Sequence, residues 1–199
     1  IKKHLFSLRK LAKYNKIRKH TLTGGDYSSF SELQSKTASL LANNKASTIS
    51  VFKNWLEQKF YPSFYDCFSE IDAAPGVNKL FKHISNCEVK TAVVSDYGKV
   101  EQRLRDLKID TSLVNYCWGL EEDGLLKPNA KVGTHLLEKF NLKASQVLFI
   151  GDREDTDEQL AKDMSAEFLG VYFGKKKGKN ASWNSWEATS KWLIKNSFK

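Results

Sequence analysis

A run of apolar residues ends abruptly in a glycine and a cluster of carboxylates. Residues 147–150 are apolar, Gly151 follows, and Asp152 and Asp157 lie in an acidic turn before a helical pattern that begins at about residue 158. The run is typical of a buried parallel strand, and open α/β folds bind ligands at the carboxyl ends of such strands. Carboxylates gathered there suit a hard cation such as Mg²⁺. The alternative is a polar turn that caps the helix, because Asp and Thr are good caps.

Two further loops carry polar residues at the ends of predicted elements. Ser95 and Asp96 follow the apolar residues 92–94, and Lys127 lies in a later loop. The Ser95 hydroxyl and the N–H groups after it could hold phosphoryl oxygens at a helix N-terminus, and Lys127 could neutralise them. Taken singly, Ser95 could be a helix cap and Lys127 an exposed lysine. Together with Asp152 as a cation ligand, they indicate a phosphate site, with Ser95, Asp96 and Lys127 as its substrate-binding residues.

The elements that must position these residues fall into two stretches. From residue 1 to about 72, apolar residues recur at helical spacing, and residues 23–26 separate a first helix from a second. This stretch predicts a bundle of three or four helices. From residue 75, strands and helices alternate, which is typical of a parallel sheet with helices on both faces.

The alternating stretch predicts an α/β fold with a Rossmann-like parallel sheet beside the small helical domain. The domains are expected at 1–74 and 75–199. Strands are expected at 91–95, 116–118, 147–150 and 168–173, and helices at 77–84, 100–107, 131–140, from about 158, and 183–194. The lysine-rich residues 174–180 are expected to form a surface loop.

Composition narrows the class of protein. A chain of 199 residues can bury a full core. Cys67, Cys87 and Cys117 are odd in number and lack the spacing of a disulfide framework or a zinc site, which favours a reducing, cytoplasmic location. No apolar run is long enough to span a membrane, so no membrane partner is expected.

The net charge of +9 is concentrated at the two ends of the chain. Residues 1–20 hold eight Lys or Arg and no acid, and residues 175–199 hold seven Lys and one acid, so the middle is acidic. Basic ends could contact nucleic-acid phosphates. Such runs are more often solvated faces, so a nucleic-acid partner is not expected, and the oligomeric state is left open.

The motifs together resemble those of the haloacid dehalogenase superfamily. Its second motif, an apolar strand that ends in Ser or Thr, is similar to Ala92-Val93-Val94-Ser95. Its third, a lysine commonly followed by proline, is similar to Lys127-Pro128. Its fourth, Gly-Asp with a second acid four or five residues on, is similar to Gly151-Asp152 with Asp157. The match covers residues 75–174, and the helical stretch resembles the cap that many members insert between their first and second motifs.

The resemblance implies a magnesium-dependent phosphatase that acts on a small phosphorylated metabolite. In this family an aspartate on the first strand attacks the phosphoryl group and forms an aspartyl phosphate, and a second aspartate two residues later is the general acid and base. Mg²⁺, the lysine and the hydroxyl stabilise the transferred charge. Ser95, Lys127, Asp152 and Asp157 are thus the expected catalytic residues. Asp152 would bind the metal, and Asp157 would orient Lys127 or a water on the metal.

The first motif, an apolar strand that ends in Asp-x-Asp, has no match before the helical stretch. The Asp-x-Asp of residues 155–157 belongs to the fourth motif. Loss of a central strand would leave buried N–H and C=O groups unpaired, at about 1 to 3 kcal/mol each. The strand is therefore expected upstream of Ile1, and the chain without it is expected to be inactive.

Two other functions remain open at this stage. A dehalogenase of the same fold is disfavoured by Asp152, because family members that attack carbon–halogen bonds need no metal and usually lack this acid. A catalytically inactive relative, or a module that binds polyanions through the basic ends, predicts affinity that falls steeply with salt.

Overall fold

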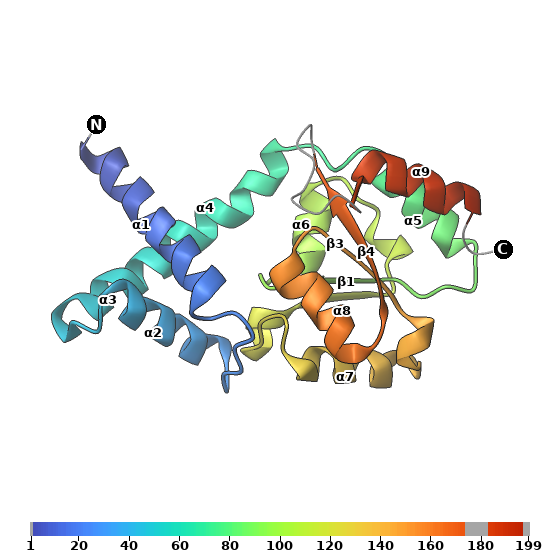
Figure 1. Ribbon diagram of the computed structural model, residues 1–199. Coiled ribbons are helices and arrows are strands. Elements are labelled where there is room, and N and C mark those ends of the chain that lie inside the picture. The colour runs from blue at the N-terminus through green and yellow to red at the C-terminus, as the bar shows by residue number, and fades with distance from the viewer. Residues whose placement is uncertain (1, 174–182, 197–199) are drawn as a thin grey trace.

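The computed structural model describes residues 2–173 and 183–196 in two lobes (Figure 1). Helices α1 to α4 form one lobe, and the strands with α5 to α9 form the other. Within these ranges, no helix is both long enough and apolar enough to cross a membrane. The surface loop predicted at 174–180 lies outside the described residues.

The second lobe contains parallel strands between helices, as predicted. Its strands are β1 (Ala92–Ser95), β2 (Tyr116–Gly119), β3 (Leu148–Gly151), β4 (Glu167–Tyr172) and the short β5 (Asn184–Ser185). Its helices are α5 (Val77–Ser85), α6 (Val100–Asp106), α7 (Ala130–Phe140), α8 (Gln159–Met164) and α9 (Trp186–Asn196). All paired strands are parallel. The α/β fold class is confirmed.

The sheet is divided into two parts. Strand β1 pairs with β2, and β3 pairs with β4, which pairs with β5. Among the described residues, β1 and β3 therefore each lack a partner along one edge. Such an edge presents unpaired N–H and C=O groups.

Strand β3 is less buried than the sequence predicts. Leu148 and Ile150, which lie on one face of the strand, are 39% and 38% exposed. The prediction of a strand buried on both faces was wrong for this part of the chain, because within the described ranges no strand lies along the free edge of β3 to help cover it.

Separate clusters of apolar side chains hold the helices to the two parts of the sheet. Helices α7 and α8 pack around Trp118, Leu120, Val132, Leu136 and Leu160. On the other side, Val77, Val100, Leu104 and Ile109 bring α5 and α6 together.

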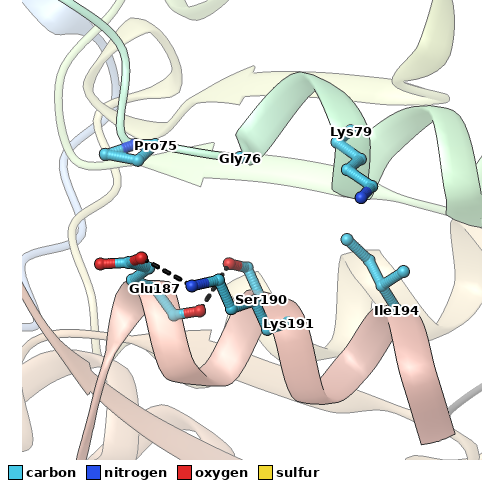
Figure 2. A pocket seen from close by; sticks show the side chains of 7 residues that line it. All are labelled: Pro75, Gly76, Lys79, Glu187, Ser190, Lys191 and Ile194. Carbon is cyan, nitrogen blue, oxygen red and sulfur yellow. Dashed lines mark hydrogen bonds and ion pairs between the residues drawn. The ribbon is translucent and has the colours of Figure 1, made fainter.

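A pocket of about 220 Å³ lies between α5 and α9 (Figure 2). Lys79 and Ile194 face each other across it, and Lys191 is paired with Glu187 on the wall formed by α9 at 2.7 Å. None of the polar residues predicted to do chemistry lines this pocket.

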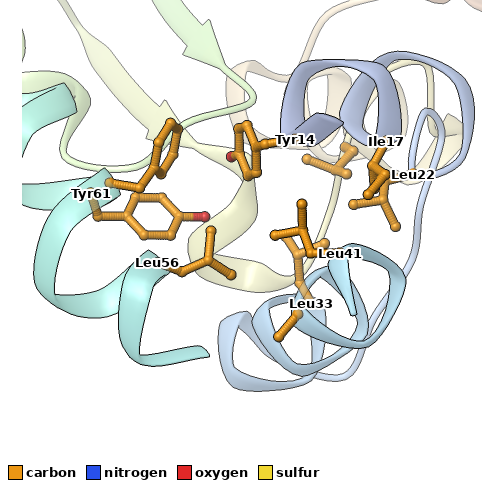
Figure 3. Close-up of a cluster of buried hydrophobic side chains, with 10 residues drawn as sticks. Tyr14, Ile17, Leu22, Leu33, Leu41, Leu56 and Tyr61 are labelled. Atoms are coloured by element: carbon orange, nitrogen blue, oxygen red, sulfur yellow. The ribbon is translucent and has the colours of Figure 1, made fainter. Parts of the chain in front are cut away.

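The first lobe is built around a core of aromatic and aliphatic side chains (Figure 3). Its helices are α1 (Lys2–His20), α2 (Phe30–Leu41), α3 (Ala46–Trp55) and α4 (Tyr61–Asp66). Tyr14 and Leu33 are fully buried in this core. At the start of α2, Ser29 accepts a hydrogen bond from the Glu32 N–H, a common N-cap arrangement. The predicted helical bundle is confirmed, whereas the domain boundary at residue 74 stays a prediction.

The helix that contains α3 does not stop where Pro62 interrupts the pattern. A π-helical turn, Leu56–Phe60, connects α3 directly to α4. Proline lacks the N–H of a regular helical hydrogen bond and crowds the preceding turn, and a widened turn accommodates both effects. The turn also directs Leu56 and Phe60 into the core.

Candidate active site

The polar residues predicted from three loops meet at the carboxyl ends of β1 and β3. Lys127 Nζ lies 2.5 Å from Asp157 Oδ1. The Lys127 backbone N–H donates to Asp96 Oδ1 at 2.9 Å, and the Asp152 N–H donates to Asp157 Oδ2 at 3.2 Å. The structure thus brings Asp96, Lys127, Asp152 and Asp157 into one connected group.

Asp157 connects the lysine to the acidic turn. One carboxylate oxygen accepts from Lys127, and the other accepts from the backbone of Asp152. The side chains of Lys127 and Asp157 are only 15% and 12% exposed, so their attraction is weakly screened by solvent. The geometry matches the expectation that Asp157 orients Lys127, and its catalytic role stays a prediction.

Replacement of Gly151 by alanine is expected to separate this pair. A Cβ at Gly151 would lie 2.5 Å from Asp157 Oδ2 and 2.5 Å from Asp157 Cβ, so the Asp157 side chain would have to move away. Overpacking of this kind costs about 1 to 3 kcal/mol. We expect a lower midpoint in urea unfolding. An unchanged midpoint would contradict the close packing.

The backbone of Lys127 is held from two sides. Asp96 accepts from its N–H, and its carbonyl accepts from the Gly24 N–H at 3.0 Å. The Leu126 N–H also donates to the Gly25 carbonyl at 3.0 Å. Sequence reasoning treated residues 23–26 only as a break between helices. The paired glycines were the available signal, since glycine permits close approach of two backbones.

Asp96 makes a structural contact that was not predicted from the sequence. One of its carboxylate oxygens is occupied by the Lys127 N–H, which fixes the loop that presents the lysine. The expected contact between Asp96 and substrate stays a prediction.

Ser95, at the end of β1, accepts two hydrogen bonds through its hydroxyl oxygen. The donors are the Tyr97 N–H at 3.2 Å and Arg103 Nη1 at 3.0 Å. The first bond lies in the turn before α6, whose N-cap residue is Lys99, so the alternative that Ser95 caps a helix was wrong. Arg103 was not singled out from the sequence, because nothing in the local pattern of α6 distinguishes it from Arg105.

The environment of Asp152 suits a cation. Burial and the nearby charge of Asp157 raise the pKa of Asp152, although Lys127 and Arg153 oppose the shift. A divalent ion would offset both the burial of the Asp152 carboxylate and its repulsion by Asp157. Within the described ranges, no cluster of three His, Cys, Asp or Glu side chains could hold a metal by itself. Asp152 therefore fits as one ligand of Mg²⁺, an ion that commonly uses one or two carboxylates and completes its shell with substrate oxygens and water.

Glu121 is a buried carboxylate that sequence reasoning missed. It lies in the short 3-10 helix Leu120–Asp123 after β2, and its side chain is 0% exposed. Its oxygens accept from the Gly98 N–H at 2.9 Å and the Tyr61 hydroxyl at 3.1 Å, and they lie 3.4 Å from Arg18 Nη1. Glu121 thus joins the loop after Ser95 to α1 and α4 of the helical lobe.

Arg18 makes a second contact between the lobes. Its Nη2 donates to the Asp96 carbonyl at 3.0 Å, and its guanidinium lies 4.6 Å from the centre of the Tyr97 ring. One of the eight basic residues of the N-terminal segment is therefore used inside the protein rather than on a solvated face.

Comparison with known proteins identifies a family. A family model described as "Haloacid dehalogenase-like hydrolase" matches residues 7–171. No curated protein sequence matches the chain at a significant level.

Several solved structures share the fold. A HAD phosphatase from Thermococcus onnurineus is 12% identical with a TM-score of 0.61, covering 85% of this chain and 88% of its own. A protein assigned as a phosphoglycolate phosphatase from Lactobacillus delbrueckii is 19% identical with a TM-score of 0.57. The match covers 84% of this chain and 80% of that protein. A protein assigned as a beta-phosphoglucomutase from Thermotoga maritima is 18% identical with a TM-score of 0.54. The match covers 85% of this chain and 81% of that protein. At these identities the likeness concerns the fold alone.

Proposed function

The chain belongs to the haloacid dehalogenase-like hydrolase family, and we propose that its site hydrolyses a small phosphorylated compound with the help of Mg²⁺. The observation that carries this proposal is the ion pair between Lys127 and Asp157, placed beside Asp152 at the ends of β1 and β3. A lysine held in this way presents a fixed positive charge to a phosphoryl group, while the adjacent carboxylate suits a metal.

Different residues bind the phosphoryl group, orient the lysine and hold the metal. In this proposal, the Ser95 hydroxyl binds a phosphoryl oxygen together with Lys127. The expected N–H donors after Ser95 are not available, because those of Tyr97 and Gly98 donate to Ser95 and Glu121. Asp157 orients Lys127. Asp152 holds Mg²⁺, which when bound neutralises charge on the phosphoryl group.

The nucleophile in this proposal is an aspartate on a strand from outside residues 1–199, seated between β1 and β3. Two observations support it: each of these strands pairs on one side only among the described residues, and the Asp-x-Asp of residues 155–157 belongs to the turn after β3. The aspartate would attack phosphorus and form an acyl phosphate. At the same time the P–O bond to the leaving alcohol breaks, and a second acid protonates the oxygen of that alcohol. Water would then release inorganic phosphate and return a proton to that acid.

Hydrolysis of p-nitrophenyl phosphate by the protein that includes this strand tests the proposal. We expect activity with Mg²⁺, loss of activity with EDTA, and at least a 100-fold lower turnover for Asp152→Asn. Asp163→Asn is the control, because Asp163 is an exposed acid on α8. Residues 1–199 alone are expected to show no turnover.

Two results would count against the proposal. Turnover that is insensitive to EDTA and to Asp152→Asn would show that Mg²⁺ has no role. If 2-haloacids were also better substrates than phosphomonoesters, a dehalogenase would be favoured. A protein that carries the strand and still hydrolyses no phosphomonoester would favour an inactive or polyanion-binding relative.

A further inference from the structure

We infer that Arg103 is a positioning residue that turns the Ser95 hydroxyl into a hydrogen-bond donor toward the bound phosphoryl group, and that the helical lobe holds Arg103 in place. This inference rests on the proposed function. It adds to that function a residue on α6 and a physical link between the helical lobe and the phosphate site.

The Ser95 hydroxyl oxygen accepts two hydrogen bonds. A hydroxyl has one hydrogen to donate and two lone pairs to accept with. Both lone pairs of Ser95 Oγ are used, by the Tyr97 N–H at 3.2 Å and Arg103 Nη1 at 3.0 Å. Neither bond uses the hydroxyl hydrogen, and among the described residues none accepts it. Tetrahedral geometry at the oxygen then directs the hydrogen away from both donors, so it remains available to an anion.

Arg103 also contacts backbone carbonyls of the loop after Ser95. Its Nη1 also lies 3.1 Å from the Tyr97 carbonyl and 3.4 Å from the Gly98 carbonyl. Arg103 thus bridges the hydroxyl and the backbone of the loop that must wrap the phosphoryl group. Hydrogen bonds from a charged donor are stronger than neutral ones, and the planar guanidinium fixes their directions.

The helical lobe contacts Arg103 through two aromatic rings. The Arg103 guanidinium lies 4.6 Å from the ring centre of Phe68 and 5.6 Å from that of Phe64, within the range of cation–π attraction. Phe64 is on α4, Phe68 is in the turn that follows it, and Phe64 also packs against Tyr97 at 4.5 Å between ring centres. The helical lobe therefore contacts both groups that donate to Ser95.

The Nε atom of Arg103 is buried. It has no hydrogen-bond partner within the described part of the chain. An unpaired buried donor is costly. Contacts with Phe64 and Phe68 offset part of this cost, so displacement of the helical lobe would weaken the hold on Arg103 and on the Ser95 hydroxyl.

A double-mutant cycle on phosphate affinity tests the inference. The probe is inorganic phosphate in the presence of Mg²⁺, titrated calorimetrically into the complete protein. Arg103→Met keeps the aliphatic stem between the rings but removes the guanidinium. We expect about tenfold weaker phosphate binding in the wild-type background, and less than twofold further loss in the Ser95→Ala background, because Arg103 acts through Ser95.

Two further variants separate positioning from folding. Arg103→Lys retains the charge without the planar fork, so it is expected to show a smaller loss with the same dependence on Ser95, and it replaces Arg103→Met if that variant does not fold. Arg105→Met is the matched control, because Arg105 lies on the same helix, 61% exposed and paired with Glu101. It is expected to leave phosphate affinity unchanged.

The possible outcomes distinguish this inference from the proposed function. Equal losses in both backgrounds, or no loss in either, would overturn the role of Arg103 while phosphate binding itself upheld the site. A wild-type protein that binds no phosphate with Mg²⁺ would overturn the proposed function and this inference with it.

Discussion

Replacement of Lys127 by methionine is expected to reduce phosphatase turnover by at least 100-fold in the complete protein. Lys127 Nζ is the cation that the structure holds at Asp157, and a preorganised charge aimed at a transition state typically contributes 10²- to 10³-fold. The substitution keeps an unbranched side chain, one atom shorter, and removes the charge and its N–H donors. Steady-state turnover of p-nitrophenyl phosphate is the measurement.

The same substitution is expected to weaken the fold. It leaves Asp157 largely buried and unpaired beside Asp152, and a broken buried pair costs roughly 3 to 5 kcal/mol, with the lower end applying here because both side chains retain some exposure. Urea unfolding measures this loss. Lys131→Met is the matched control: Lys131 pairs with Asp26 in a pair that is 67% and 43% exposed, so little change is expected. Turnover of Lys127→Met within threefold of wild type would contradict the assigned role.

Replacement of Glu121 by leucine is expected to have the largest effect on stability, roughly 3 to 5 kcal/mol. Leucine fills a similar volume but offers no acceptor. The Gly98 N–H, two tyrosine hydroxyls and the Arg18 guanidinium would then lose their shared carboxylate while staying buried or, for Tyr65, partly buried. Since whole domains are stable by about 5 to 15 kcal/mol, such a loss is a large fraction of the total.

Urea unfolding of Glu121→Leu tests this expectation, with Glu138→Leu as control. Glu138 lies exposed on α7, where a surface substitution is expected to change stability by no more than about 0.5 kcal/mol. A Glu121→Leu protein as stable as wild type would show that the carboxylate does not hold the two lobes together.

The pH dependence of stability gives an independent check on Glu121. Burial raises the pKa of Glu121 above its ordinary value of 4.5, although Arg18 and the three hydrogen-bond donors oppose the shift. A folded state with a raised pKa binds its proton more firmly, so this contribution to stability is complete below pH 4.5 and is lost as the pH rises through the folded value. Glu121→Gln cannot titrate, so its stability relative to wild type is expected to increase over that range. A difference that does not vary with pH would contradict the burial.

The features that could be predicted from the sequence are those set by local pattern. The apolar runs before Ser95 and Gly151 predicted β1 and β3, and helical spacing predicted α5, α6 and α7 within a few residues. The polar residues after β1 and β3 and in the loop of Lys127 predicted a shared site, because the carboxyl ends of parallel strands meet at one edge. The structure joins Lys127 to Asp96 and to Asp157, whereas the place of Ser95 in that site stays a prediction.

The features that could not be predicted depend on contacts between distant residues. Glu121 and Glu122 are adjacent acids, and the burial of Glu121 depends on partners far away in the sequence, such as Tyr61, 60 residues earlier. The backbone bond between Gly24 and Lys127 likewise joins two lobes. Pro62 marked an interruption in the sequence, but whether a helix ends or widens there depends on the packing of Leu56 and Phe60.

The linkage between Mg²⁺ and phosphate binding tests the central claim most directly. If Asp152, Lys127 and Ser95 form one site, each ligand must raise the affinity of the protein for the other by the same factor. We expect calorimetric titration of phosphate to show at least tenfold tighter binding with Mg²⁺ than without, and Asp152→Asn to abolish that difference while leaving weak phosphate binding intact. Phosphate affinity that is independent of both Mg²⁺ and Asp152 would contradict the account.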